Sequence, residues 1–352
     1  MTIEKPRIIS VGTANPATWY SQREVIERYG VADPRIQSLF TSGHIDGRSL
    51  ILPPPSPEGV PLETQGQLLA KHLAGAKDFG ARAVHGALEQ AGLTPGDVDY
   101  LVGVTTTGFM APGLSAHLVQ HLGMRPDCAR LDVVGMGCNA GLNGLNPTAT
   151  WARAHPGKNA LMACIEVCSA AYVFDNTMRT AVVNSLFGDG AAAIVVRADP
   201  ADDVRFAPEI LDFESHIIVP ALRAMRYDWD DTAHKFSFFL APDIPYFIGE
   251  HAETPVDALL ARHGLRRRHV AHWVVHSGGK KVIDAMMYNL GLTAHDVRHT
   301  VSVLRDHGNL SSGSFLFSLQ RLHAEHVVER GDYGVFITMG PGTSIETALV
   351  RW

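Results

Sequence analysis

The sequence predicts an α/β fold built from two duplicated halves. Apolar runs with the length of buried strands alternate with segments of helical spacing throughout the 352 residues. Two pairs of matched landmarks are separated by the same interval, 309 − 138 = 171 for Cys138 and Asn309 and 275 − 104 = 171 for Val104 and Val275. A polar stretch at 199–203 separates the halves, so we expect one domain over residues 1–200 and another over 201–352.

The helix signals of the first half are local. Ser21 and Glu24 form a capping box, which predicts a helix that ends at Gly30. The segment 62–92 is expected to be mostly helical, with an interruption near one of the glycines at positions 75 and 80. A surface loop is expected at Pro53–Pro57.

Strands and further helices follow in the same order in both halves. In the first half we expect strands over 97–104, 131–134, 159–165 and 191–197, with a helix from Cys138 through Trp151. In the second half we expect strands over 269–275, 333–339 and 344–350, with a helix from Asn309 through about Glu325. This alternation favours mostly parallel sheets covered by helices, whose active sites lie off the carboxyl ends of the strands.

The composition excludes several classes of protein. The net charge is −6 and the only dense basic run is 266–268, so no nucleic-acid partner is expected. No apolar run approaches the roughly 18 residues of a membrane-spanning helix, and the N-terminus lacks the apolar segment of a signal peptide. Four cysteines are too few for a disulfide framework, so we expect a cytoplasmic protein. His323 and His326 lack a third ligand at a suitable spacing, so no metal is expected.

Cys138 is the most informative residue of the chain. It lies among glycines, after the apolar run 131–134 and before a segment of helical spacing. Such a turn places a thiol at a helix N-terminus, where the helix dipole and free N–H groups favour the thiolate. His276 and Asn309 also follow apolar runs, as if aimed at the same point. A thiolate, an imidazole and an amide at strand ends suit carbon–carbon bond formation on a thioester, so we interpret the chain as an enzyme.

Five motifs then occur together, in an order and at spacings that resemble the type III polyketide synthases, the chalcone-synthase-like branch of the thiolase fold. They are the cysteine turn 134–141, His276-Ser277-Gly278-Gly279, Gly308-Asn309-Leu310-Ser311-Ser312, Phe187-Gly188-Asp189-Gly190 and Gly340-Pro341-Gly342-Thr343. The resemblance covers nearly the whole chain and implies a five-layered αβαβα thiolase-like fold. It also implies a homodimer that needs no cofactor, because CoA thioesters are its substrates.

Within this family the chain is most similar to a bacterial branch that serves glycopeptide-antibiotic pathways. That likeness implies condensation of four malonyl-CoA units by decarboxylative Claisen steps, with closure of the tetraketide to a 3,5-dihydroxylated phenylacetyl thioester. Pathway helper enzymes could complete the dehydration. Two alternatives stay open: a synthase of the same family that makes a resorcinol, pyrone or naphthalene, and a non-catalytic partner subunit of the same fold.

The resemblance assigns roles to particular residues. Cys138 would carry the growing chain, His276 would hold its proton, and His276 and Asn309 would stabilise the enolate formed when malonyl-CoA loses CO2. Removal of one such donor typically costs about 3–4 kcal/mol. The substrate-binding residues implied by the family are the gating pair Phe187 and Phe238, the cavity wall Gly340, Pro341 and Gly342, and the CoA-phosphate contacts Arg48 and Lys281. Cys128, Cys164 and Cys168 are interpreted as buried core residues.

Overall fold

A computed structural model describes residues 5–54, 63–198 and 207–352. Residues 55–57 of the expected loop and the expected boundary between residues 200 and 201 lie outside these ranges. The division into two domains therefore stays a prediction.

Nine strands form one mixed sheet in the order β11-β12-β13-β8-β1-β7-β6-β4-β5. Those of the first half are β1 (Pro6–Ala14), β4 (Tyr100–Thr105), β5 (Ala129–Val134), β6 (Ala160–Glu166) and β7 (Gly190–Ala198). Those of the second half are β8 (Glu209–Ile217), β11 (Val270–Val275), β12 (Tyr333–Gly340) and β13 (Ser344–Arg351). Two small sheets pair β2 (Trp19–Ser21) with β3 (Gly47–Ser49) and β9 (Met225–Asp230) with β10 (Lys235–Leu240).

The two halves repeat one arrangement of strands. The order β4-β6-β7-β1 corresponds to β11-β12-β13-β8, and the halves meet where Arg7 of β1 pairs with Glu209 of β8. The helices α6 (Ala140–Ala154) and α12 (Ser314–Glu325) occupy equivalent places, and 154 + 171 = 325 brings their last residues into register. The counterpart of β5 is missing, because 129 + 171 = 300 and 134 + 171 = 305 fall within helix α11 (Arg298–His307).

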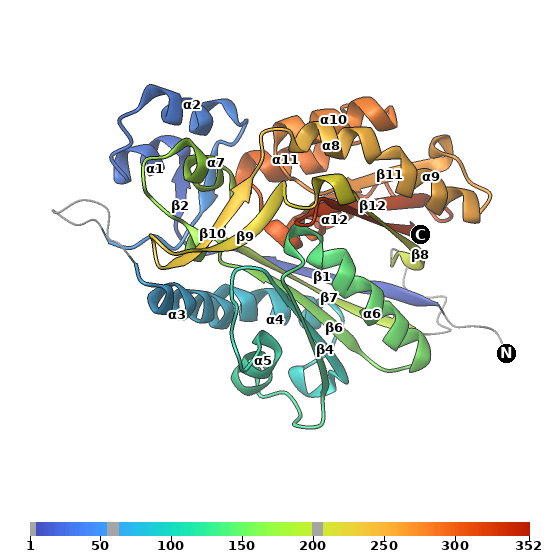
Figure 1. Cartoon of the computed structure of the whole chain (residues 1–352). Coiled ribbons are helices and arrows are strands. Elements are labelled where there is room, and N and C mark those ends of the chain that lie inside the picture. The colour runs from blue at the N-terminus through green and yellow to red at the C-terminus, as the bar shows by residue number, and fades with distance from the viewer. Residues whose placement is uncertain (1–4, 55–62, 199–206) are drawn as a thin grey trace.

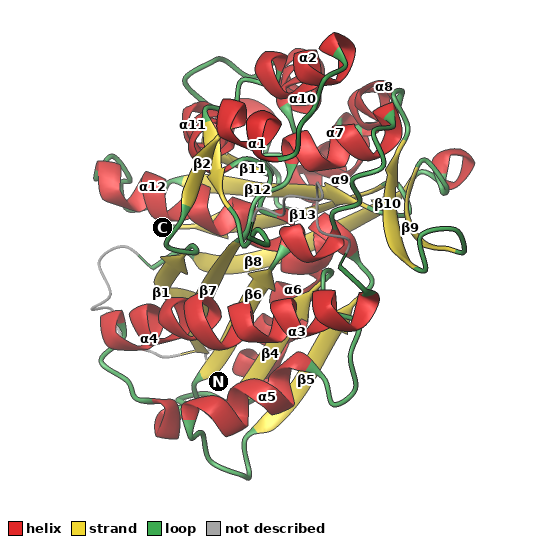
Figure 2. Ribbon diagram, turned by 90° about the vertical axis from the view of Figure 1, so that its left-hand side faces the viewer, coloured by secondary structure: helices red, strands yellow, loops and turns green. Residues whose placement is uncertain are grey.

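Helices and sheet alternate in five layers (Figures 1 and 2). One outer layer contains α3 (Gln65–Gly75), α4 (Ala81–Gln90) and α5 (Leu114–Leu122), the middle layer contains α6 and α12, and the other outer layer contains α8 (Ile244–His251), α9 (Glu253–Arg262), α10 (Lys280–Leu290) and α11.

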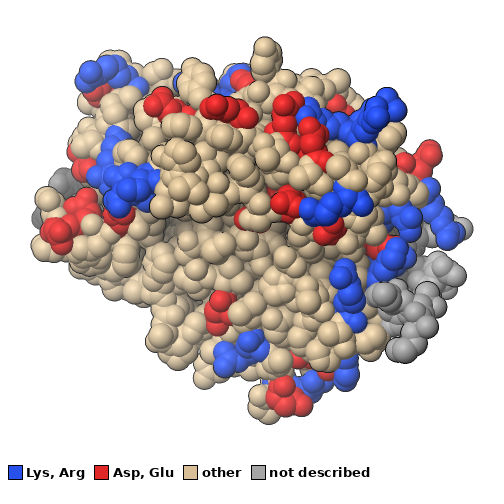
Figure 3. All heavy atoms as spheres, turned by 45° about the vertical axis from the view of Figure 1, so that its right-hand side comes forward, with Lys and Arg blue, Asp and Glu red and all other residues tan. Residues whose placement is uncertain are grey.

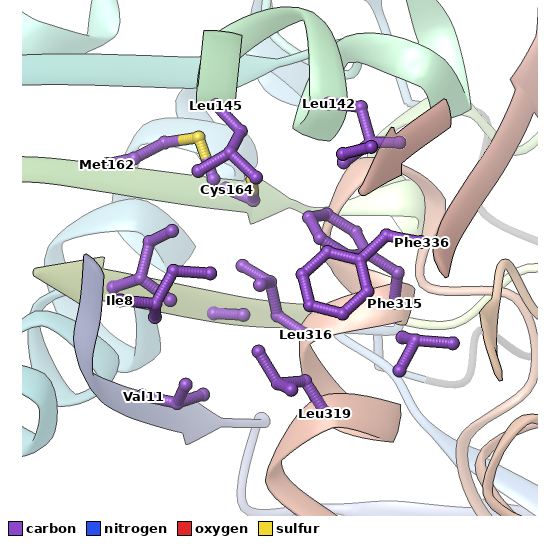
Figure 4. Close-up of a cluster of buried hydrophobic side chains, with 14 of the residues drawn as sticks. Ile8, Val11, Leu142, Leu145, Met162, Cys164, Phe315, Leu316, Leu319 and Phe336 are labelled. Atoms are coloured by element: carbon purple, nitrogen blue, oxygen red, sulfur yellow. The ribbon is translucent and has the colours of Figure 1, made fainter. Parts of the chain in front are cut away.

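Alternation along the strands produces this layering. Met162 of β6 packs in the central cluster beside α6 and α12 (Figure 4). Its neighbour Leu161 packs toward α3 to α5. On β12, Phe336 lies in the central cluster and Ile337 packs toward α8 to α11. The predicted thiolase-like architecture is therefore confirmed.

The prediction of mostly parallel sheets is wrong. Only the pairs β4–β5, β4–β6 and β11–β12 are parallel, while β1–β7, β1–β8, β6–β7, β8–β13 and β12–β13 are antiparallel. Between β12 and β13 the reason is the turn at 341–343, since so short a connection can join only antiparallel strands.

The local helix signals hold well. Helix α1 (Gln22–Arg28) begins with the capping box of Ser21 and Glu24. The interruption expected in 62–92 is a π-helical segment, Ala76–Gly80, between α3 and α4. The remaining helices are α2 (Pro34–Ser42) and α7 (Met178–Leu186).

Two further observations concern the length of the helices and the charge on one face. In the described part of the chain no helix is long and apolar enough to cross a membrane. On the face seen in Figure 3, basic and acidic side chains are interspersed and do not gather into one basic patch.

Candidate active site

The turn between β5 and α6 presents Cys138 to the interior. Gly137–Asn139 form a single 3-10 turn directly before α6, and Cys138 is only 6% exposed. Gly137 has φ +64°, and a Cβ there would stand 2.0 Å from Cδ of Pro341. Because only glycine tolerates both the left-handed backbone and this contact, the glycine directly before the thiol has a steric cause.

His276 follows β11 and is fixed from two sides. Its N–H donates to the carbonyl of Ile337 at 2.8 Å, and its Nδ1 is hydrogen-bonded to the Ser314 hydroxyl. The Ser314 hydroxyl itself donates to the carbonyl of Ser311 at 3.2 Å. Since a hydroxyl has one proton to donate, Nδ1 of His276 carries the hydrogen in this network, and Nε2 is left as a base.

Asn309 is held by the backbone of an adjacent segment. It forms a parallel bridge with Phe187, its N–H donates to Leu186 O at 2.9 Å, and its Oδ1 accepts the Ser311 N–H at 2.8 Å. The expectation that Asn309 follows a strand is wrong, since α11 precedes it. Gly308, with φ +70°, makes the turn out of that helix.

The ionisation of the site differs from the sequence-based expectation. Burial raises the pKa of the Cys138 thiol to about 12, with Glu166 adding to the rise, although hydrogen bonds with the Ser311 hydroxyl and the Asn309 amide lower it. Burial lowers the pKa of His276 to about 3. The predicted resting thiolate is therefore replaced by a neutral thiol and a neutral imidazole, because desolvation outweighs the helix terminus.

Cys138 lines a narrow cavity of about 30 Å³. The cavity is lined by Thr106, Thr107, Gly137, Cys138, Cys168, Ala171, Val183, Phe187, Tyr227, Phe238 and Ser311. The rings of Phe187 and Phe238 meet edge to face there, 5.5 Å apart at 85°. The structure thus brings both aromatic residues singled out in the sequence to the cysteine.

Cys168 is buried in the core, as expected, and it also lines the cavity from the 3-10 turn that follows β6. Cys164 lies within β6 in the central cluster, and Cys128 packs beneath α5, as expected.

Sequence reasoning also missed a buried carboxyl behind the cavity. Glu166 accepts hydrogen bonds from the Ser312 hydroxyl at 2.6 Å and from the Thr106 N–H at 3.0 Å, and burial raises its pKa. Thr107 donates to the same carboxyl through its hydroxyl at 3.1 Å. An acidic residue inside the apolar run 160–168 was the available signal.

The segment Gly340–Gly342 abuts the cysteine turn rather than appearing among the cavity-lining residues. A Cβ at Gly340 would stand 2.8 Å from the Asn139 nitrogen and 3.1 Å from the Cys138 nitrogen. Pro341 covers Gly137, and Gly342 turns the chain with φ +79°. These residues fix the backbone of the turn that carries the Cys138 thiol.

The two residues predicted to contact CoA differ in exposure. Arg48 is fully buried and hydrogen-bonds to protein groups, so the predicted contact with CoA phosphates is wrong. Lys281 is exposed in the first turn of α10, and no ion pair involves it in the described part of the chain. Its role toward CoA stays a prediction.

No group of three or more His, Cys, Asp or Glu able to hold a metal ion occurs among the residues that the structure describes.

Comparison with known proteins identifies the class. The profile for "Chalcone and stilbene synthases, C-terminal domain" matches residues 221–352, and that for "FAE1/Type III polyketide synthase-like protein" matches residues 55–211. The chain belongs to the type III polyketide synthases, enzymes that condense CoA thioesters.

Two relatives carry the same specific name, 3,5-dihydroxyphenylacetyl-CoA synthase. The protein of Streptomyces toyocaensis is 56% identical over 100% of this chain and 91% of its own length. That of Amycolatopsis balhimycina is 56% identical over 99% of this chain and 94% of its own. Among solved structures, the C-terminal type III polyketide synthase domain of Steely1 from Dictyostelium superposes with a TM-score of 0.90 at 25% identity, covering 99% of both chains.

Proposed function

We propose that the chain is a homodimeric 3,5-dihydroxyphenylacetyl-CoA synthase that acts in glycopeptide-antibiotic biosynthesis. It condenses four malonyl-CoA units and closes the tetraketide to the aromatic thioester. The observation that carries this proposal is the shared cavity of Cys138, Phe187 and Phe238, with Asn309 close enough to lower the pKa of the Cys138 thiol. Identity of 56% to synthases of that name over the full chain favours this product.

Loading is expected to proceed from neutral partners. As the Cys138 sulfur attacks the thioester of malonyl-CoA, Nε2 of His276 takes the thiol proton and keeps it, while the CoA thiolate leaves and is protonated by solvent. Cys138 and His276 become charged only while the bound substrate excludes water. The high pKa of the resting Cys138 thiol therefore limits its reaction before substrate binds.

Chain extension uses the same groups. When the next malonyl-CoA loses CO2, the enolate oxygen accepts hydrogen bonds from the protonated His276 and the Asn309 amide. The enolate carbon attacks the Cys138 thioester and the Cys138 thiolate leaves, so the chain, now two carbons longer, is a CoA thioester. Before the next extension the Cys138 thiolate attacks that thioester, takes the chain back and releases CoA. After the last extension, an intramolecular aldol-type attack and loss of water give the ring.

The accompanying proposals follow the family. No cofactor is required, Lys281 contacts the CoA phosphates, and the enzyme works in the cytoplasm, with helper enzymes available for dehydration. The rival product, a resorcinol, pyrone or naphthalene, differs only in how the same cavity folds the chain. A non-catalytic partner subunit would have no use for the intact set of Cys138, His276 and Asn309.

Intact-protein mass spectrometry after brief exposure to malonyl-CoA tests the nucleophile. The wild type and Cys128→Ala are expected to carry an acyl adduct, because Cys128 lies outside the cavity beneath α5. Cys138→Ala is expected to carry none. An adduct of equal yield on folded Cys138→Ala would overturn the assignment.

A further inference from the structure

Arg48 is a buried cation without a carboxylate partner. It is fully buried, and no Asp or Glu of the described ranges forms an ion pair with it. Its Nη1 donates to Phe187 O at 2.6 Å and to Asn184 O at 2.7 Å, and its Nη2 donates to Gln22 Oε1 at 2.8 Å. Because burial of a cation is costly, these particular acceptors must offset a large desolvation penalty.

The C-terminus of α7 supplies that compensation. Asn184 lies in the last turn of α7 and Phe187 is its C-cap residue, so both carbonyls belong to the negative end of the helix. Tyr172 also donates through its hydroxyl to Phe187 O. The carbonyl of the gating residue is thus held by two donors, one of them charged.

The same carbonyl lies beside the segment that carries the catalytic amide. Asn309 N–H donates to Leu186 O at 2.9 Å, and Gly188 N–H donates to Asn309 O at 3.0 Å. These two bonds bracket Phe187, so a shift of Phe187 along the chain direction also moves Asn309.

The stem of Arg48 touches both segments of this bridge. A Cβ at Gly308 would stand 2.7 Å from Arg48 Cδ and 2.6 Å from Leu186 O. A Cβ at Gly188 would stand 3.4 Å from Arg48 Cβ. One side chain therefore packs on the residue before Asn309 and on the residue after Phe187, while its head holds Phe187 itself.

We propose that Arg48 is a positioning residue that fixes the register between the gate residue Phe187 and the catalytic Asn309. The inference rests on the proposed roles of these two residues. Arg48 acts through them, without touching substrate. Without the Arg48 guanidinium, the β-bridge between Phe187 and Asn309 can shift, which displaces the Asn309 amide from the enolate oxygen. A displacement of about 1 Å costs about a hundredfold in rate.

Arg48→Lys is the informative substitution. A lysine keeps the charge, but its single ammonium group cannot span the acceptors that the planar fork reaches on α7 and on Gln22. We expect kcat for CO2 release from malonyl-CoA to fall at least about tenfold. The KM and the yield of acyl-Cys138 are expected to stay within about threefold, since neither depends on the enolate. The matched control Arg262→Lys changes an exposed arginine at the end of α9 whose partners Asp212 and Glu214 lie on β8, and it should stay within about threefold of wild type in every readout.

A double-mutant cycle with Asn309→Ala separates positioning from general loss of structure. If Arg48 acts through Asn309, Arg48→Lys lowers CO2 release no further in the Asn309→Ala background. An undiminished loss in that background, or unchanged kcat in the single variant, overturns the inference. A normal rate in Asn309→Ala alone would instead refute the proposed enolate role.

Should Arg48→Lys fail to fold, Gly308→Ala carries the test, since it inserts a methyl group between Arg48 and Leu186. The same non-additivity with Asn309→Ala supports positioning, and additivity overturns it.

Discussion

Replacement of Gly137 by alanine tests whether the turn beneath the nucleophile is sterically fixed. The new Cβ would stand 2.0 Å from Cδ and 2.3 Å from Cγ of Pro341, on a backbone with φ +64°. A left-handed conformation costs a non-glycine residue about 1–2 kcal/mol. Overpacking adds about 1–3 kcal/mol, so the free energy of unfolding should fall by about 2–5 kcal/mol.

A second substitution separates the two contributions. Pro341→Ala removes both clashing ring atoms, so Gly137→Ala/Pro341→Ala should recover about 1–3 kcal/mol relative to the sum of the single changes, while the backbone cost remains. The turn also carries Cys138, so Gly137→Ala should lower kcat by about a hundredfold for each ångström of displacement.

The assay is urea unfolding at one protein concentration, followed by steady-state condensation of malonyl-CoA. Gly66→Ala is the control, because its Cβ would meet only Thr64 Oγ1 at 3.9 Å within α3. It should raise stability by about 0.5–1 kcal/mol. Wild-type stability and activity in Gly137→Ala, or strict additivity with Pro341→Ala, would refute the steric account.

Three further predictions follow from the site. In Asn309→Ala, CO2 release from malonyl-CoA should fall at least about a hundredfold, while acylation of Cys138 is largely kept; an equal loss in both would argue against an oxyanion role. Burial depresses the pKa of His276 to about 3 and that of His72 to about 4, below the ordinary 6.5. The folded protein keeps both histidines neutral, so they cost no stability above pH 6.5. As the pH falls from 6.5 toward those values, each histidine should lower the free energy of unfolding by about 1.4 kcal/mol per pH unit. Urea midpoints at pH 7.5 and 5.5 check this, and equal midpoints would contradict it. Phe238→Ala removes one ring of the edge-to-face pair, so mass spectrometry should reveal altered chain lengths among the products; an unchanged product profile would count against a gating role.

The parts of the fold that sequence predicts are those set by local chemistry. The capping box at Ser21, the glycines around Cys138 and the alternation along β6 and β12 each depend on a few neighbouring residues. The relative direction of two strands depends on the connection between them, and the alternation of strands and helices does not determine it. The short turn between β12 and β13 was the available signal for an antiparallel pair.

Properties that depend on burial could not be predicted in the same way. Arg48 looks like a surface cation in sequence, but the end of α7, distant in the chain, surrounds its guanidinium. The turn at Cys138, taken alone, indicates a lowered thiol pKa. Desolvation in the cavity outweighs this effect and raises the pKa of Cys138. Glu166 and Cys168 belong to the site because β6 ends beside the cavity, a relation that only the packed sheet creates.

The most direct test of the central claim is incubation of the purified enzyme with fully ¹³C-labelled malonyl-CoA alone, followed by mass spectrometry. The account predicts 3,5-dihydroxyphenylacetate or its CoA ester, with label in all eight carbons of the acyl group. Products limited to pyrones, a resorcinol or a naphthalene would contradict the proposed ring closure, and the absence of any condensed product would contradict condensation of malonyl-CoA by this chain.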